Sequence, residues 1–211
     1  MGRRPVPAPE AFPALAALLE YPGEGFPARA RAARQTLHEA APACAKALAA
    51  FFDRAETAAG ADGAALEETY ALTFDWNPDR CLEVGWHLYG EQYDRGAFLV
   101  RMRERLREAG IDEGTELPDH LAAALRLVGR LPPQDAAAFA GDALLPALER
   151  VVAGFSDRTD NPYAAVVRCV HDALQAIPGA RERRAEAVAK AAARGGPVVS
   201  PRNSADSPGV R

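Results

Sequence analysis

Apolar residues recur at intervals of three and four along most of the chain, which is the spacing of one face of an α-helix. Leu66, Tyr70 and Phe74 follow this spacing and predict a helix from about residue 64 that ends at residues 75–77. A longer apolar run over residues 144–155 predicts a helix with a wide buried face near the centre of the fold. Pro146 either kinks that helix or marks its start.

Asparagine–proline pairs occur at two places where helices are expected to begin. Asparagine suits the position before a helix because its side chain accepts a free backbone N–H, and proline at the first helical position lacks only a donor that has no partner there. Asn161–Pro162 therefore predicts an apolar-faced helix that follows it. Asn77–Pro78 predicts another helix, with an aromatic stripe formed by Trp86, Tyr89 and Tyr93.

The composition favours helix over strand. Alanine makes up about one residue in five, whereas isoleucine occurs only at positions 111 and 177. Because the helical patterns are joined by short connections and show no repeat, the chain is predicted to be an all-α, single-domain bundle of about eight to ten helices. We expect this domain to span residues 11–194, between a disordered proline-rich arm, residues 1–10, and a disordered tail, residues 195–211.

Charge and cysteine content restrict the environment and the partners. The chain has 25 basic and 29 acidic residues, and no dense basic tract that would neutralise phosphates, so nucleic acid is not an expected partner. The apolar stretch at residues 12–19 is too short for a membrane span or an export signal, which predicts a cytoplasmic protein. The spacing of Cys44, Cys81 and Cys169 fits neither a disulfide framework nor a metal knuckle, so reduced thiols are expected.

The common catalytic motifs are absent. The chain contains no nucleophile elbow, phosphate-binding loop or dinucleotide turn, so we do not expect an enzyme. Glu83, His87 and Glu91 stand at four-residue steps, but no second helix with matching metal ligands can be named, and hydrogen bonds or ion pairs explain them better. No metal site is therefore predicted. A helical metal-dependent enzyme is kept as an alternative, which the absence of stoichiometric metal on elemental analysis would exclude.

Aromatic and acidic residues gather at three bends of the predicted bundle, at residues 73–76, 86–90 and 116–121. Such residues can line a groove that takes an amphipathic helix, with apolar anchors inside and carboxylates at the rim that pair with a basic peptide. The same aromatic residues also suit an ordinary core, and Asp119 suits a cap for the helix that follows it. From the residues alone, both interpretations stay open.

At these bends the chain resembles the NarJ type of nitrate reductase molybdenum cofactor assembly chaperone, a branch of the TorD/DmsD helical chaperones. The resemblance covers about residues 12–177 and depends on the order of six short motifs: LLEYP at 18–22, YALTFD at 70–75, LYG at 88–90, RG at 95–96, ELPDHL at 116–121 and NPYA at 161–164. Asn161 stands where serine is expected, a mild departure because either residue can cap a helix. Neither terminal tail carries a family landmark.

The resemblance implies a TorD/NarJ-like fold and a non-catalytic cytoplasmic chaperone. Its expected partner is the N-terminal segment of the apo catalytic (alpha) subunit of respiratory nitrate reductase. Binding would keep that subunit competent to receive molybdenum bis(molybdopterin guanine dinucleotide) and delay its docking to the membrane anchor. The chaperone itself is expected to hold no cofactor stably and to be a monomer or a weak homodimer. A chaperone for another molybdoenzyme of the same reductase family is the main alternative.

Matching the motifs residue by residue assigns nine residues to client binding. Phe74, Trp86 and Tyr89 are expected to be apolar contacts, with Tyr70 beside them. Asp75, Glu116 and Asp119 are expected at the polar rim, and Pro118 as a rigid element of the loop. His120 is expected to orient Asp119 or to respond to pH near neutrality. A purely structural role stays open for each of the nine.

Overall fold

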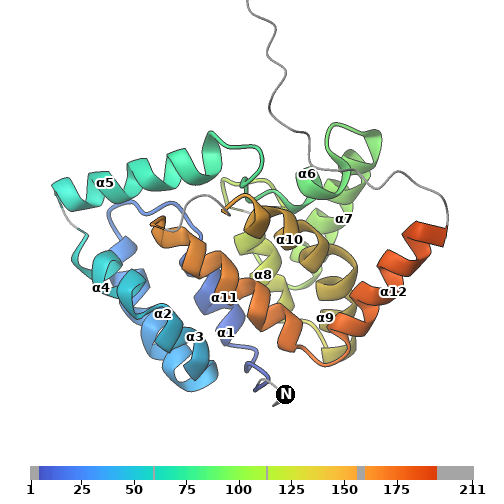
Figure 1. Cartoon of the computed structure of the whole chain (residues 1–211), viewed down its shortest axis with the longest axis horizontal. Helices are drawn as coiled ribbons and strands as arrows, with labels where there is room; N and C mark the ends of the chain where they lie inside the picture. Colours follow the sequence, from blue (N-terminus) through green and yellow to red (C-terminus); the bar gives the residue numbers. More distant parts are fainter. Residues whose placement is uncertain (1–4, 59, 113, 156–159, 194–211) are drawn as a thin grey trace, which may run out of the picture.

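The computed structural model of the protein describes residues 5–58, 60–112, 114–155 and 160–193. Within these ranges every element of regular secondary structure is a helix (Figure 1), so the predicted all-α bundle is confirmed. The elements are α1 (Ala11–Ala17), α2 (Phe26–Ala40), α3 (Pro42–Ala47), α4 (Ala49–Thr57), α5 (Ala61–Tyr70), η1 (Ala71–Asp75), α6 (Val84–Tyr89), α7 (Tyr93–Glu108), α8 (Leu121–Val128), α9 (Pro133–Phe139), η2 (Ala140–Leu144), α10 (Leu145–Ala153), α11 (Pro162–Ala176) and α12 (Ala180–Ala193).

The described residues form more helices than the eight to ten expected. Two π-helical turns join neighbouring segments, because η1 continues α5 and η2 connects α9 to α10 in one run. Pro146 is the second residue of α10, immediately after the π turn, so it marks a helix start within this run. Residues 42–57 form two helices, since Leu48 leaves helical geometry and separates α3 from α4.

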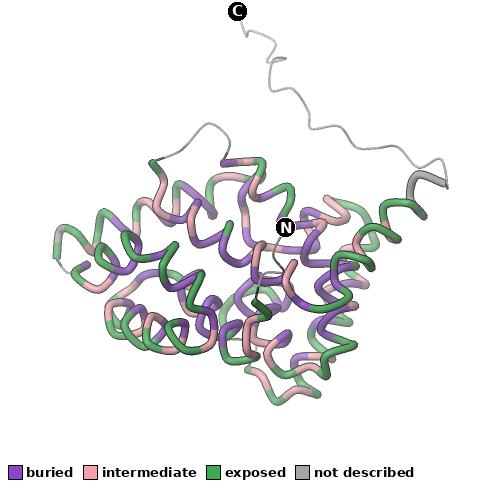
Figure 2. Tube along the Cα trace, turned by 60° about the horizontal axis from the view of Figure 1, so that its bottom comes forward, coloured by how far each residue is buried: buried purple, intermediate pink, exposed green. Residues whose placement is uncertain are grey.

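Helices from distant parts of the chain, α1, α8 and α11, lie together at the centre of the bundle (Figure 1). Leu15, Leu125 and Val166, one from each helix, have no exposed surface. Buried residues follow the inward side of each helix and exposed residues the outward side (Figure 2). Since burying one such side chain contributes about 1.5–3 kcal/mol, these helices form the stable frame on which the surface segments are built.

An aromatic cluster joins α4, α5, η1 and α11. The ring of Tyr163, which is fully buried, has its centroid 5.4 Å from that of Phe51, 5.6 Å from Tyr70 and 5.2 Å from Phe74, all edge to face. This geometry is favourable beyond the area that it buries. Leu66, Tyr70 and Phe74 are all buried, as their spacing predicted.

The two asparagine–proline pairs behave differently. Asn161 caps α11, because its side chain accepts the Tyr163 N–H at 2.9 Å, so that prediction is confirmed. The prediction that a helix begins at Asn77–Pro78 is wrong. The Asn77 side chain accepts the Asp79 N–H at 3.0 Å in a local turn, and α6 begins only at Val84. Gly90, with a φ of 59°, then ends α6 before Tyr93, which starts α7 and is 93% exposed.

The two ends of the described chain lie on the bundle surface. In the predicted N-terminal arm, residues 1–4 lie outside the described residues, and the Ala8 N–H donates to the Ala40 carbonyl at 3.0 Å. The predicted tail, residues 195–211, lies wholly outside them. At the other end, α12 packs along η2 and α9. No described helix combines the length and the apolar character that a membrane crossing needs.

Candidate functional site

Two of the motif-bearing segments meet through their backbones. The Val84 N–H donates to the Asp119 carbonyl at 3.1 Å, and the Leu121 N–H donates to the Leu82 carbonyl at 2.8 Å. These bonds form an antiparallel bridge at Glu83 and His120, an isolated pairing in an otherwise helical fold. The bridge therefore fixes the 116–121 motif against the start of α6, although the two are more than thirty residues apart in the chain.

Beside this bridge lies a small cavity of about 60 Å³, which we call the acidic pocket. It is lined by Tyr70, Phe74, Asp75, Cys81, Leu82, Glu83, Glu116 and His120. Five of the nine residues expected to bind the client are thus brought together: Tyr70, Phe74, Asp75, Glu116 and His120. Glu83, Cys81 and Leu82 were not among them. The sequence pattern indicates Glu83 only as a metal-ligand candidate.

The pocket carries three carboxylates and no lining cation. Partial burial, and then the negative charges of Glu116 and Glu83, raise the pKa of the Asp75 carboxyl. Burial, and then the charge of Glu83, raise the pKa of the Cys81 thiol to about 12, so this thiol is protonated at neutral pH. No lysine or arginine is among the described residues that line the pocket. The site therefore favours a positively charged group from outside the chain.

The π turn η1 orients the first of the two motifs. A π turn holds more residues than an α turn and often occurs at functional sites. Here it directs Phe74 into the core, where it is 2% exposed, while Leu72 and Trp76 are 46% and 76% exposed. The Arg80 Nε–H donates to the Thr73 carbonyl at 3.1 Å and holds the turn in place.

Exposed apolar residues, which we call the apolar rim, lie close to pocket residues in the sequence or contact one of them. We use this name for Tyr21, Leu72, Trp76 and Leu117, four large apolar side chains that are each more than 40% exposed. Tyr21, from the first motif, contacts the pocket residue Tyr70 edge to face at 5.5 Å and donates its hydroxyl to Glu67 at 3.1 Å. The pattern of its motif offered no signal for this role, because the contact joins segments 49 residues apart.

Asn161 links the last motif to this turn. Its Nδ2–H donates to the Thr73 hydroxyl at 2.7 Å while its Oδ1 caps α11. A serine would keep a capping oxygen but has no second polar group for Thr73. The asparagine found in place of the expected serine thus adds a connection between α11 and η1.

Replacing Asn161 with serine is therefore expected to lower the free energy of unfolding by about 1 kcal/mol, the usual value of one hydrogen bond. Urea unfolding measures this loss. In a double-mutant cycle with Thr73→Val, the two losses should not add, because both substitutions remove the same bond. Additive losses would show that the two side chains do not interact.

Asp119 is completely buried, so it does not lie at the exposed rim where it was expected. Its Oδ2 accepts the Gly85 N–H at 2.7 Å, and Gly85 is the second residue of α6. The carboxylate thus caps α6 from a distant loop, rather than the helix that follows it in the chain. Burial raises the pKa of this carboxyl, and the Gly85 N–H and the positive charge of Arg95 oppose that effect.

His120, and not Asp119, caps the helix that follows the loop. It is the cap residue of α8, where its Nδ1 accepts the Ala122 N–H at 3.3 Å. An accepting Nδ1 must be unprotonated, and burial lowers the pKa of the ring from its usual 6.5. The structure therefore holds this histidine neutral beside the acidic pocket.

We expect a histidine-dependent loss of stability below pH 6.5. There the unfolded chain binds a proton that folded His120 does not, so the free energy of unfolding falls with decreasing pH, by at most about 1.4 kcal/mol per pH unit. In His120→Asn the amide oxygen can accept the Ala122 N–H without titrating. Urea unfolding at pH 7.5, 6.5 and 5.5 should show the variant gaining on the wild type as the pH falls. Parallel losses would refute this assignment.

The remaining three predicted residues lie outside the acidic pocket. Trp86 is half-buried and donates its Nε1–H to the Pro78 carbonyl at 3.0 Å, with Arg95 stacked 5.5 Å from its ring. Tyr89 is half-buried against Phe98, at 5.6 Å between centroids. Pro118 is buried within the loop. Trp86 and Tyr89 therefore pack against Arg95 and Phe98 of α7 and do not line the acidic pocket.

The metal-ligand candidates also separate. Glu83 lines the acidic pocket, His87 is buried with its Nε2–H directed to the Cys81 carbonyl at 2.8 Å, and Glu91 is exposed. Burial lowers the pKa of His87. In the part of the chain that the structure describes, no three His, Cys, Asp or Glu side chains are grouped for a shared metal ion.

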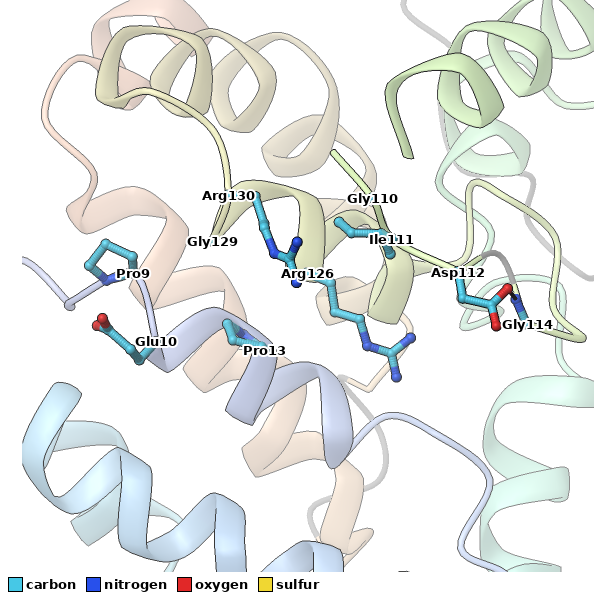
Figure 3. Close-up of a pocket in the computed structure, with 10 residues that line it drawn as sticks. All are labelled: Pro9, Glu10, Pro13, Gly110, Ile111, Asp112, Gly114, Arg126, Gly129 and Arg130. Carbon is cyan, nitrogen blue, oxygen red and sulfur yellow. Dashed lines mark hydrogen bonds between the residues drawn. The ribbon is translucent and has the colours of Figure 1, made fainter. Parts of the chain in front are cut away.

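A larger cavity, of about 550 Å³, lies at the opposite end of α8 (Figure 3). It is lined by Pro9, Glu10, Pro13, Gly110, Ile111, Asp112, Gly114, Arg126, Gly129 and Arg130. Arg126 is paired with Glu20, and Arg130 donates to the Ala109 carbonyl at 2.9 Å. Acidic and basic residues both line this cavity, and none of the nine residues predicted to bind the client is among them. The cavity therefore does not indicate one kind of ligand.

Fold and site together define an all-helical protein whose surface pocket is acidic, flanked by exposed aromatic and aliphatic side chains, and built by segments far apart in the chain. The family model described as nitrate reductase delta subunit matches residues 26–168, which include every residue lining the acidic pocket. The chain belongs to this family, whose members are NarJ-type chaperones of nitrate reductase assembly. No relative among curated proteins matches the chain.

Proposed function

We propose that this chaperone binds the N-terminal segment of the apo catalytic subunit of a respiratory nitrate reductase in the cytoplasm. The observation that carries the proposal is the acidic pocket, which has three carboxylates and no lysine or arginine among its described lining residues. The segment that supplies Asp75 also carries the exposed Leu72 and Trp76. A basic amphipathic segment complements both features, because its cations can pair with the carboxylates while its apolar face covers the rim.

Binding of this kind needs no covalent step. The chaperone holds the client segment reversibly, and the client, not the chaperone, receives molybdenum bis(molybdopterin guanine dinucleotide). Release follows when the matured subunit favours its own docked conformation, so that the two states of the client differ in affinity for the chaperone. A chaperone for another molybdoenzyme of the same reductase family has the same chemistry and is distinguished by its client.

Calorimetric titration tests the proposal. A peptide covering the N-terminal segment of the nitrate reductase catalytic subunit is titrated into the full chain, with the equivalent peptide of another molybdoenzyme as control. We expect saturable one-to-one binding of the first peptide alone. Preferential binding of the second would assign the chaperone to that other client, and binding of neither would refute peptide recognition at this site.

A variant pair locates the binding site. Asp75→Asn removes one charge from the acidic pocket, whereas Glu91→Gln removes one from an exposed position outside it. We expect the first to weaken binding about tenfold, as loss of one partially desolvated charge pair does, and the second to leave it unchanged. Equal effects would show that only the net charge of the chaperone matters.

A further inference from the structure

Two of the three cysteines meet inside the bundle. Cys44 on α3 and Cys169 on α11 are 8% and 6% exposed, and the Cys44 Sγ lies 3.9 Å from the carbonyl oxygen of Cys169. The hydrogen bond between the two thiols, together with burial, raises the pKa of Cys169. Nothing in the spacing of the cysteines indicated this pair, since 125 residues separate them.

The third cysteine is in a different place. The Cys81 Sγ lies 3.5 Å from the Pro78 carbonyl oxygen and 3.6 Å from the His87 Nε2, in the acidic pocket. It therefore serves as an internal control for any chemistry of the other two. No disulfide joins any of these three described cysteines in the structure.

We propose that Cys44 and Cys169 are a thiol–disulfide pair, which glutathione disulfide or a similar small disulfide oxidises to an intramolecular cross-link. The two cysteines lie on packed helices, with the Cys44 Sγ against the backbone of Cys169. Side-chain rotation and local movement of α3 must bring the sulfurs to the bond length of about 2.05 Å. This pairing is independent of the proposed client and of the acidic pocket.

The reaction proceeds in two exchanges. One protein thiol loses its proton, attacks glutathione disulfide and releases one glutathione, which leaves a mixed disulfide. The second protein thiol loses its proton, displaces the second glutathione and closes the Cys44–Cys169 bond. Two protein thiols and one glutathione disulfide thus become one protein disulfide and two glutathione molecules.

Access to the pair comes from local opening of α3. This helix has six residues, and its N-cap residue, Ala41, provides no side-chain hydrogen bond to the free N–H groups at the N-terminal end. Short, uncapped helices open at a lower free energy than the whole fold. Since a thiolate is the attacking form, and contact with Cys44 together with burial raises the pKa of the Cys169 thiol, oxidation should accelerate with increasing pH and with urea below the unfolding transition.

Intact mass and peptide mapping of the full-length chain test the pair. Incubation of Cys81→Ser with glutathione disulfide at pH 8 and subdenaturing urea should remove two hydrogens, about 2 Da, and link the peptides that contain residues 44 and 169. Dithiothreitol should reverse the change. Because the cross-link closes a loop of more than a hundred residues, Tm should rise by about 10 °C.

Two further variants keep the result decisive. Cys44→Ser and Cys169→Ser, each with Cys81 retained, should form at most a glutathione adduct and show no rise in Tm. A stable glutathione adduct in Cys81→Ser without cross-linking, or a cross-link that includes Cys81 in the wild type, would overturn the proposal. So would unchanged mass under conditions in which a thiol-alkylating reagent modifies both cysteines. Client binding does not enter these readouts, so failure here is separate from failure of the proposed function.

Discussion

Replacing Gly85 with alanine is expected to lower the free energy of unfolding by about 3 kcal/mol, because there is no room for a side chain at this position. A Cβ added to Gly85 would lie 2.7 Å from the Asp119 Oδ2 and 3.0 Å from the Phe98 Cδ1. Something must move, and the atom that is closest is the carboxylate oxygen that caps α6. Its displacement would break the hydrogen bond from the Gly85 N–H to the Asp119 carboxylate and leave both buried groups without this partner.

Urea unfolding measures the effect, as a lower midpoint at an unchanged slope. Gly96 provides the matched control, since it lies in α7 with no atom within 4 Å of an added Cβ. Gly96→Ala should stabilise the protein by about 0.5–1 kcal/mol, through helix propensity alone. If Gly85→Ala is as stable as the wild type, the contact between Asp119 and α6 is not a determinant of the fold.

Reversing two charges in the acidic pocket, Asp75→Lys with Glu116→Lys, should weaken binding of the client peptide at least about 100-fold. Both side chains are exposed, so the fold should tolerate the change, while a basic peptide would then meet two cations instead of two carboxylates. Titration calorimetry at low and high salt is the measurement. Salt should weaken binding to the wild type, because it screens the attraction between opposite charges.

Glu182→Lys with Glu186→Lys is the control for this prediction. It makes the same change in net charge on the exposed surface of α12 and should leave the affinity within about twofold. A comparable loss of affinity in both double variants would show that recognition depends on the overall charge of the chaperone. Retained binding in the pocket variant would place the client elsewhere on the chaperone.

Local patterns predicted those features of the fold that depend on local interactions. The spacing of Leu66, Tyr70 and Phe74 gave the buried face of α5 and η1, and the Asn161–Pro162 pair gave the start of α11. The same signal failed at Asn77–Pro78, where the backbone that follows pairs with residues 119–121 instead of forming a helix. Such pairing between distant segments leaves no periodicity in either one.

In the candidate site, too, the sequence predicted local features but not those that depend on contacts between distant segments. The motifs identified five residues of the acidic pocket, but they did not separate surface residues from buried ones. Asp119 and Asp75 are both acidic residues in matched motifs, yet one is fully buried and the other exposed. Burial of Asp119 follows from the approach of α6, and the position of Tyr21 follows from its contact with Tyr70. Neither is visible before the chain is folded.

The π turn at residues 71–75 makes the register of this surface adjustable by a single residue. A π turn is related to an α turn by one inserted residue, which the wider turn accommodates within the helix. Deleting one position there would restore an α turn and change which of residues 71–75 face the core and which face solvent, while the preceding helix stays as it is. Related chains could therefore acquire different client preferences through a one-codon deletion or insertion at this turn, without rebuilding the bundle that supports it.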